Sequence, residues 1–521
     1  MGRILLAAAL TGTLGTLAFP EFSLWPLALV AYVPLFLVLR DRRPRDRFFA
    51  GWLAGFVLHA GVYTWIYDTA RIMSSLPPWL AALVLLAFSL AHGLCQGFIA
   101  LAVEPVRLHT GRAWPFAVAI TAAVVEALFP HLFPWYLGNA LYRTITLTQV
   151  ADLIGIYGLS ALCYGAAAAL VDASVRRRDR GWRAALPPVA VLAGVMVAVA
   201  GYGAWRIASI RGSAPEATLR VALLQPFMTG EEKGDLKGMA RQVLYDKSVN
   251  LLREVRGEPL DLVVLPEGGF PFYFVPNVER IAPAEGEPIK IHFGRRFMHE
   301  IRSSGVPVVF GSLMVGDDDR VRNAAVFVDR GPPLIYDKRR LVPFGEFMPL
   351  SDTFPSLRNA VKNVSDFVAG ERHVPFVVAG RSLLPTICYE AIFPGFVRDA
   401  ANVEPRADAI LNLTNDVWFG RTAAPELHLM VQVTRAVEQR IPLIRSTNSG
   451  VSAFVDATGE ITGRTGVYEM AILRGSVEIR SVWSFYRQFG DVFLWGSAAI
   501  VVLLMLYTMR ARSFSGKSPA R

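Results

Sequence analysis

Cysteine is scarce in this sequence, with three residues among 521. Three thiols cannot form a disulfide framework, so the fold does not depend on an oxidising compartment and each cysteine has to be judged singly. Cys95 and Cys163 lie in long hydrophobic runs, whereas Cys388 lies outside them, in the stretch LLPTICYEAIFPG (383–395). A lone cysteine at the end of a short apolar run is either a small buried hydrophobe or a nucleophile.

Several familiar binding and catalytic motifs are missing. The eight histidines are scattered, and no Cys/His pair has the spacing of metal ligands, so we expect no metal. There is no glycine-rich loop that could hold a phosphate and no GxSxG motif of a serine hydrolase. The sequence therefore predicts chemistry without a cofactor.

Long hydrophobic runs are absent between residues 207 and 490 and abundant elsewhere. At 53% hydrophobic residues and a mean hydropathy of +0.38 the chain is too apolar for a soluble protein. With 33 prolines, 43 glycines and 18% charged residues it is also unlike a simple helical bundle, so we expect two unlike parts. Runs that reach the roughly 20 residues needed to cross a bilayer lie at 4–20, 22–40, 48–66, 79–103, 114–130, 150–173, 185–206 and 491–509.

The first seven runs predict a membrane domain of seven transmembrane helices at 1–206, and the last predicts an eighth at 491–509, before a cytoplasmic tail at 510–521. The first run also has the basic start and small residues of a cleaved signal peptide, an alternative that would leave seven spans. Between the two groups, short β-type segments alternate with helix-compatible stretches. This alternation predicts an α/β domain at 216–485.

The net charge of +10 fits either nucleic acid or an anionic membrane surface. The arginine clusters RDRRPRDR (40–47) and RRRDRGWR (176–183) lie in alternate connections between the predicted spans, as do Arg107 and Arg112. The positive-inside rule places these connections in the cytoplasm and the 216–485 domain on the outer side. Because the clusters hold the excess positive charge, we expect a lipid bilayer and no nucleic acid as partner.

Three stretches of the predicted α/β domain end a strand-like run with a charged or nucleophilic residue. They are VVLPEGGFP with Glu267, IYDKRRLVPFGEFMP with Lys338 and Glu346, and PTICYEAIFPG with Cys388. A cysteine attacks as its thiolate, so it needs a base to take its proton and a cation to hold negative charge on the substrate oxygen. Glutamate and lysine supply both roles. Taken singly, Glu267 could instead interact with a helix dipole, and Lys338 could be a solvated surface charge.

These stretches, in this order and followed by NDVWFG (415–420), resemble the nitrilase superfamily. The apolar runs around the domain, together with FPWYLGNALYRTITLTQVADLIGIYGLSAL (133–162) and HLMVQVTRAVEQRIPLIRSTNSGVSAFVD (428–456), are most similar to its membrane-integrated branch, the apolipoprotein N-acyltransferases. The resemblance implies a multi-span α-helical membrane domain joined to a four-layer α-β-β-α sandwich. It also implies a Glu-Lys-Cys triad, which falls here on Glu267, Lys338 and Cys388.

The resemblance further implies supporting roles for Glu346, Tyr389 and Glu390. Two features of the family are missing, namely an aromatic residue before the PE dipeptide and a tryptophan in the loop after the first strand of the domain. Leu265 and the polar TGEEKGDLKG (229–238) stand at these positions. Because the triad is intact, these departures bear on lipid recognition more than on the reaction.

Polar residues near the end of the domain are candidates for shaping the pocket, although turn chemistry explains the first of them nearly as well. They are Asn415, Asp416 and Trp418 in NDVWFG, and Arg445, Thr447 and Asn448 in RSTNSG. Glu126 lies inside an apolar run, where an ionisable residue is either functional or paired within the bundle.

Two aromatic, proline-bounded segments leave the triad residues directly. We expect Phe344, Phe347 and Met348, with Phe272 and Phe274, to form lids that rest in the outer leaflet and pass acyl chains toward the cysteine. Packing against the domain core is the alternative.

The function implied by the resemblance is the last step of lipoprotein maturation. A phospholipid would donate an acyl chain to Cys388, and the thioester would pass it to the α-amine of the N-terminal diacylglyceryl-cysteine of an apolipoprotein. The protein would be a multi-pass protein of the bacterial inner membrane, with its catalytic domain on the periplasmic side. One alternative is a membrane-anchored amidase or hydrolase of the nitrilase type, acting on C–N bonds with water as second substrate. The other is a transporter or scaffold with an inactive domain.

Overall fold

The computed structural model describes residues 1–521 except 75, 228–238, 285, 317, 352, 355, 357–364 and 515–521. The loop that lacks the expected tryptophan therefore lies outside the described residues. The chain divides into two compact units. The first comprises Met1–Thr64, Ala82–Ser209 and Ser484–Arg521, and the second comprises Trp65–Ala81 and Ile210–Trp483.

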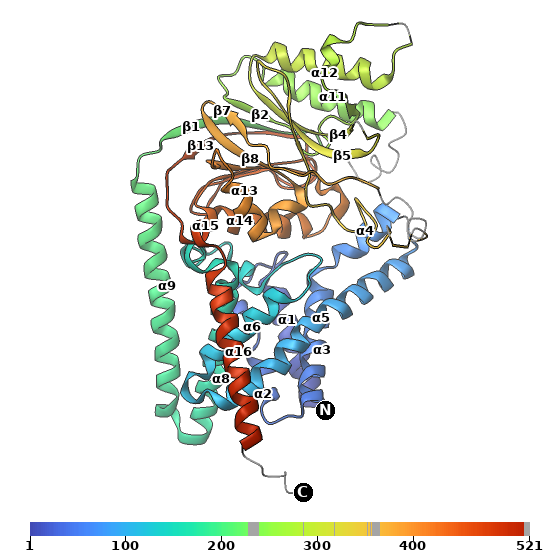
Figure 1. Ribbon diagram of the computed structural model, residues 1–521. Helices are drawn as coiled ribbons and strands as arrows, with labels where there is room; N and C mark the ends of the chain where they lie inside the picture. Colours follow the sequence, from blue (N-terminus) through green and yellow to red (C-terminus); the bar gives the residue numbers. More distant parts are fainter. Residues whose placement is uncertain are drawn as a thin grey trace. The chain divides into compact units, whose positions relative to one another are not determined.

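The first unit is helical (Figure 1). The helices that lie wholly or mostly in it are α1 (Gly2–Ala18), α2 (Val33–Leu39), α3 (Pro44–Val62), α5 (Pro78–His109), α6 (Trp114–Leu128), α7 (Ile145–Thr148), α8 (Ala151–Arg180), α9 (Leu186–Gly212), α15 (Phe485–Phe489) and α16 (Val492–Phe514). Four helices of the described chain are long and apolar enough to cross a membrane, and a bent pair would make a fifth. Three further apolar helices are shorter.

Local sequence explains two of the short or bent helices. Run 22–40 forms a 3₁₀ turn at Trp25–Leu29 and then α2, and each piece begins with a proline near its first position, Pro26 and Pro34. Proline has no N–H to continue a preceding helix, so a new helix begins there. The helix pair that starts at Pro44 bends by 56° after Val62.

Helix α9 exposes a largely apolar surface. Its most apolar window has a mean hydropathy of 2.1, and 6% of that window is buried inside the protein. Exposed valines and tryptophan such as Val191, Val197 and Trp205 cover its surface. So much exposed apolar surface is unfavourable in water and favourable in lipid, as expected of a membrane protein.

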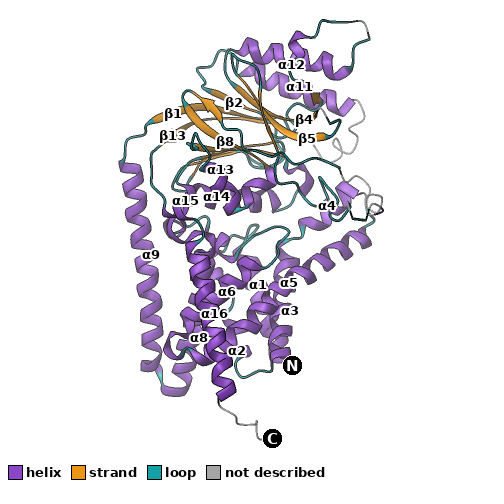
Figure 2. Cartoon of the chain, in the orientation of Figure 1, coloured by secondary structure: helices purple, strands orange, loops and turns teal. Residues whose placement is uncertain are grey.

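The second unit contains two β-sheets with helices beside them (Figure 2). The first sheet has the order β13 (Ala471–Ile479), β1 (Ala217–Gln225), β2 (Leu262–Val264), β4 (Val308–Val315), β5 (Val321–Val328), β6 (Leu334–Asp337), and β3 (Tyr273–Phe274) pairs with β4. The second has the order β12 (Ile461–Arg464), β11 (Ala453–Val455), β10 (Leu443–Thr447), β9 (Ala409–Thr414), β8 (Arg381–Ile387), β7 (Phe376–Val378). The helices of this unit are α4 (Trp65–Ser74), α11 (Met239–Glu254), α12 (Ile289–Ser304), α13 (Pro394–Ala401) and α14 (Ala424–Gln439).

Alternating side chains of the strands divide between two hydrophobic cores. Leu223 and Val264 of the first sheet share one core with Leu411 and Ile444 of the second, so the two sheets pack face to face. Residues of the opposite face, such as Val263, pack with α11 and α12 in the other core.

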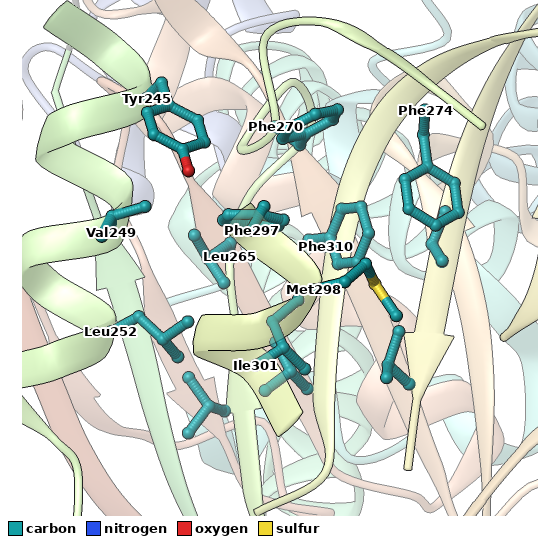
Figure 3. Close-up of a cluster of buried hydrophobic side chains, with 14 of the residues drawn as sticks. Tyr245, Val249, Leu252, Leu265, Phe270, Phe274, Phe297, Met298, Ile301 and Phe310 are labelled. Carbon is teal, nitrogen blue, oxygen red and sulfur yellow. The ribbon is translucent and has the colours of Figure 1, made fainter. Parts of the chain in front are cut away.

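Figure 3 shows this second core, in which the ring of Phe297 lies among the side chains of the strands and α11. The ring of Phe297 stacks on that of Phe270, with 4.9 Å between ring centroids, and meets the ring of Phe310 edge-on, with 5.1 Å between centroids. Helices α13 and α14 lie beside the second sheet (Figure 1). The layers are therefore α-β-β-α, and the predicted fold class is confirmed.

Candidate active site

The three predicted triad residues each follow a strand. Glu267 lies three residues beyond β2, Lys338 directly follows β6, and Cys388 directly follows β8. Lys338 Nζ lies 3.6 Å from Glu267 Oε1, and the lysine side chain is 1% exposed. Both residues act electrostatically on the Cys388 thiol. The structure therefore brings together, at the ends of strands from both sheets, the three residues that the sequence singled out.

Glu346 completes the surroundings of the lysine. Its Oε1 accepts from Lys338 Nζ at 2.8 Å, and its Oε2 accepts from the backbone N–H of Val342 at 2.8 Å. A further residue, Asn323 of β5, was missed by the sequence analysis. Its Nδ2 donates to Glu267 Oε1 at 2.6 Å and to Glu346 Oε1 at 3.0 Å, so one amide fixes both carboxylates.

Close packing of the backbone positions Glu267. A Cβ atom at Gly311 of β4 would lie 2.5 Å from the Glu267 Cα, so a side chain at this position would displace the carboxylate. The other oxygen of this carboxylate, Oε2, is buried and has no hydrogen-bond partner among the residues that the structure describes. A buried carboxylate oxygen without a donor is suited to accept a proton.

The electrostatics define the resting state of the site. Burial alone would lower the pKa of Lys338, but the carboxylates of Glu346 and Glu267 outweigh it and raise the pKa. Burial, assisted by Glu267, raises the pKa of Cys388, and Lys338 opposes this. The lysine is thus a permanent cation and the cysteine a thiol that needs a base as it attacks.

The backbone at Cys388 is unusual. Its φ of +51° lies in the left-handed region, which a residue with a side chain seldom adopts. The residue begins a short 3₁₀ segment, η7 (Cys388–Ile392), directly at the end of β8. This sharp turn carries the sulfur on a rigid element, as a nucleophile requires.

Glu390 holds this turn from behind. Its Oε2 accepts from Ile387 N at 2.7 Å, and its Oε1 accepts from Arg339 N at 2.6 Å and Arg340 N at 3.1 Å. Tyr336 Oη donates to both oxygens, at 2.8 and 2.9 Å. One buried carboxylate therefore links the strand that bears Cys388 to the segment that bears Lys338.

Tyr389 is buried beside Glu390 and meets the ring of Phe393 edge-on at 4.8 Å. Burial raises the pKa of its hydroxyl to about 12, and the cations Arg340 and Lys338 lower it in part. It is therefore neutral at physiological pH.

A buried polar network supports the second sheet. Asp416 Oδ2 accepts from Arg445 Nη2 at 2.7 Å, and Asp416 Oδ1 lies 2.9 Å from His428 Nδ1. His428, on α14, was not singled out from the sequence, because its role depends on contacts with residues that are distant in the chain. Burial and then Arg445 lower its pKa, and its ring interacts with the backbone of Cys388. The neutral imidazole thus joins this network to the nucleophile.

The other candidates of the NDVWFG motif lie at the ends of the same strands. Asn415 Oδ1 accepts from Val417 N at 3.3 Å, which is turn chemistry, and its amide lies beside Gly268. Trp418 is half-buried, and its carbonyl oxygen accepts from Thr69 Oγ1 of α4 at 2.8 Å.

Asn448 follows β10, whose neighbour β9 pairs in parallel with β8. Two residues earlier, Ser446 Oγ donates to Val264 O of the first sheet at 3.4 Å. The backbone N–H of Asn448 donates to Thr414 O of β9 at 3.2 Å, which fixes this residue at the ends of β9 and β10. It is 1% exposed, and neither amide atom has a hydrogen-bond partner among the described residues.

The expected lids are only partly at the surface. Phe344 is 56% exposed, Phe347 is half-buried and Met348 is buried. The expectation for Phe272 and Phe274 was wrong. Both are buried in the core beneath α12, because this helix covers the segment that follows Glu267.

Glu126 lies in the first unit and is paired there. Its Oε1 accepts from Leu137 N at 2.9 Å and from Tyr164 Oη at 3.0 Å. These contacts give it a structural place in the helical bundle.

Comparisons with known proteins cover nearly the whole chain. Residues 11–169 match the model of the apolipoprotein N-acyltransferase N-terminal domain, and residues 220–484 match that of carbon-nitrogen hydrolase. The apolipoprotein N-acyltransferase of Geobacter metallireducens is 31% identical over 98% of this chain and 96% of its own length. The apolipoprotein N-acyltransferase of Pseudomonas putida is also 31% identical, over 98% of this chain and 97% of its own length.

Solved structures are similar to a little over half of the chain. A CN-hydrolase superfamily protein of Xanthomonas campestris is 18% identical, with a TM-score of 0.37 over 58% of this chain and 99% of that protein. An amidase of Nesterenkonia sp. AN1 is 23% identical, with a TM-score of 0.37 over 53% of this chain and 96% of the amidase.

Proposed function

Because the chain belongs to the apolipoprotein N-acyltransferase family, an enzyme family with a carbon-nitrogen hydrolase domain, we propose that Cys388 carries the acyl chain as a thioester. The donor is a phospholipid, and the acceptor is the α-amine of the N-terminal diacylglyceryl-cysteine of an apolipoprotein. The observation that carries the proposal is the carboxylate of Glu267, whose buried Oε2 has no hydrogen-bond partner among the described residues. Its Oε1 lies 3.6 Å from Lys338 Nζ, and both charges act on the Cys388 thiol.

In the first half-reaction, Cys388 Sγ attacks the ester carbonyl carbon while its proton passes to Glu267. Lys338 Nζ stabilises the oxyanion of the tetrahedral intermediate. The intermediate collapses by breaking the bond to the ester oxygen, which takes the proton from Glu267 and leaves as lysophospholipid. The products are the Cys388 thioester and lysophospholipid, which carries away the thiol proton. Glu267 is then ionised again, and no cofactor is consumed.

In the second half-reaction, the neutral α-amine attacks the thioester carbonyl carbon. Glu267 takes a proton from the nitrogen, an amide bond forms, and the C–S bond breaks to release Cys388, which recovers its proton. The Oδ1 of Asn448 is suited to accept an N–H of the incoming amine, and a phospholipid ester has no such donor. A covalent intermediate lets one site serve two bulky lipids in turn.

The surroundings of the site support a lipid substrate. Phe344 is 56% exposed and lies two residues before Glu346, which accepts from Lys338 Nζ at 2.8 Å, so an exposed apolar ring stands close in sequence to a contact of the lysine. We expect this ring to rest in the lipid and guide the acyl chain. The half-buried Phe347 and the buried Met348 would continue the apolar path toward the interior. Trp418 and Asn415 would line the pocket from the second sheet.

The arginine clusters support the location. With 40–47 and 176–183 in the cytoplasm, the catalytic unit faces the periplasm from the inner membrane. An alkaline phosphatase reporter fused after Ser213 should therefore be active. A reporter that works only in the cytoplasm at this position would contradict the assignment.

The reaction is tested by supplying liposomes of phospholipid and a diacylglyceryl-cysteine peptide to the purified enzyme. The expected product is the N-acyl peptide, with little free fatty acid. Cys388→Ala should lose the product, whereas Cys95→Ala, which changes a buried cysteine elsewhere, should keep it. Release of fatty acid without N-acyl peptide would favour the hydrolase instead.

A further inference from the structure

A large cavity lies in the helical unit and has no part in the proposed reaction. Its volume is about 700 Å³, and it is bounded by residues of α3, α5, α6 and α16 and of the connection before α3. One wall is apolar and includes Phe98, Leu101, Val125 and Met505. The volume falls in the range of cavities that hold organic ligands, about 300–1,000 Å³.

Asp41, Arg42, Arg47 and Glu104 form the charged part of the lining, called here the charged wall. The two acidic groups share one neighbouring cation. Arg107 Nε and Nη2 donate to Glu104 at 2.7 and 2.6 Å, and Arg107 Nη2 lies 3.6 Å from Asp41. Counting this arginine, three cations face two carboxylates, so the charged wall is net positive.

The two arginines of the wall differ in character. Arg47 is 7% exposed on the first turn of α3, which is rare for an arginine. Arg42 is exposed in the same basic stretch. A buried and an exposed guanidinium that border one cavity can hold a phosphate between them, because each presents a planar fork of N–H donors.

We propose that this cavity binds one anionic phospholipid, with its phosphate between Arg42 and Arg47 and an acyl chain along the apolar wall. A lining that combines apolar residues with arginines matches a molecule with an acyl chain and a charged head. Basic cavities between membrane helices on the cytoplasmic side are known to bind anionic head groups. The lipid is bound, not consumed, and the site shares no residue with the Cys388 site, so the proposal does not depend on the proposed reaction.

Native mass spectrometry of the full-length protein with added phosphatidylglycerol tests the site. We expect one retained lipid, bound about 30-fold more weakly by Arg42→Ala/Arg47→Ala. The matched control is Arg43→Ala/Arg45→Ala, which removes the same charge from the same stretch at residues that do not line the cavity. It should keep the lipid.

Two further experiments test whether the apolar wall contributes to binding and whether the bound phosphate belongs to a lipid. Leu101→Trp should block the lipid by filling the cavity with the charges unchanged, and inorganic phosphate should displace it poorly. Phosphatidylethanolamine should bind more weakly than phosphatidylglycerol. Absence of a one-to-one adduct in the parent protein, or equal loss in both arginine pairs, would overturn the proposal. Formation of the Cys388 thioester, measured on the same samples, shows separately that each variant is folded.

Discussion

Glu390→Gln is the most informative single change at this site. It removes the charge of the carboxylate that accepts from three backbone N–H groups near Cys388, and it replaces one oxygen by an NH₂ group. An amide can accept with one atom only. If its NH₂ took the place of Oε1, it would face two backbone N–H groups, those of Arg339 and Arg340. The better orientation places the NH₂ at Oε2, where one donor, Ile387 N, loses its acceptor.

Two terms of similar size oppose each other in the stability of this variant. Loss of a hydrogen bond to a charged group costs about 1.5–3 kcal/mol. Burial raises the pKa of Glu390 from 4.5 to about 6, so holding the ionised group in the fold at neutral pH costs about 2 kcal/mol, which glutamine avoids. The free energy of unfolding should therefore change little.

The rate of thioester formation should nevertheless fall by about 10²-fold. The lost anchor is the N–H of the residue directly before Cys388, and a displacement of about 1 Å in a reacting group has this effect. Intact-protein mass spectrometry after mixing with phospholipid measures the rate, and chemical denaturation measures stability. The control is Tyr336→Phe, which removes a hydroxyl from the same carboxylate and keeps its three backbone donors.

The same carboxylate predicts opposite pH trends for activity and stability. The folded pKa lies above the unfolded value, so the contribution of Glu390 to stability is complete below about pH 4.5 and is lost as the pH rises through about 6. Activity should instead fall as the pH drops through 6, because the protonated group loses an acceptor for its donors. If Glu390→Gln reacted at the parent rate, or shared the parent's pH trend in stability, the reasoning would be refuted.

Three other changes test separate parts of the account. Lys338→Met should slow thioester formation by about 10²–10³-fold through loss of oxyanion stabilisation, and a rate near the parent's would exclude this role. Asn448→Leu should leave thioester formation near the parent rate and slow its transfer to the peptide amine, so that the thioester of Cys388 accumulates; equal slowing of both steps would contradict the assignment. Phe344→Ser should slow reaction with phospholipid in liposomes but not with a small soluble thiol reagent, whereas Leu334→Ser, at a 44% exposed residue of the same unit, should change neither.

The triad could be found from the sequence because its residues follow short hydrophobic runs. Glu267, Lys338 and Cys388 each stood out as a charged or nucleophilic residue at the end of such a run. Asn323 could not be found in this way. It lies inside β5, and its role arises from the pairing of that strand with β6, which brings Asn323 beside Lys338.

The errors of the sequence analysis have physical reasons too. Phe272 and Phe274 stand in an irregular, proline-bounded segment, which is typical of an exposed loop. Their burial depends on α12, which no local pattern connects to that segment. The run at 22–40 is apolar enough for one helix, and two prolines divide it into a 3₁₀ turn and α2. The seven spans before the catalytic domain stay a prediction.

The central claim is that an acyl chain rests on Cys388 between the two half-reactions. Incubation of the purified enzyme with phospholipid and no peptide should add the mass of one acyl chain to the protein. Hydroxylamine should remove it, and peptide mapping should place it on Cys388. Cys388→Ala should show no adduct. An adduct that persists in this variant, or N-acylation of the peptide by an enzyme that never carries the acyl chain, would contradict the account.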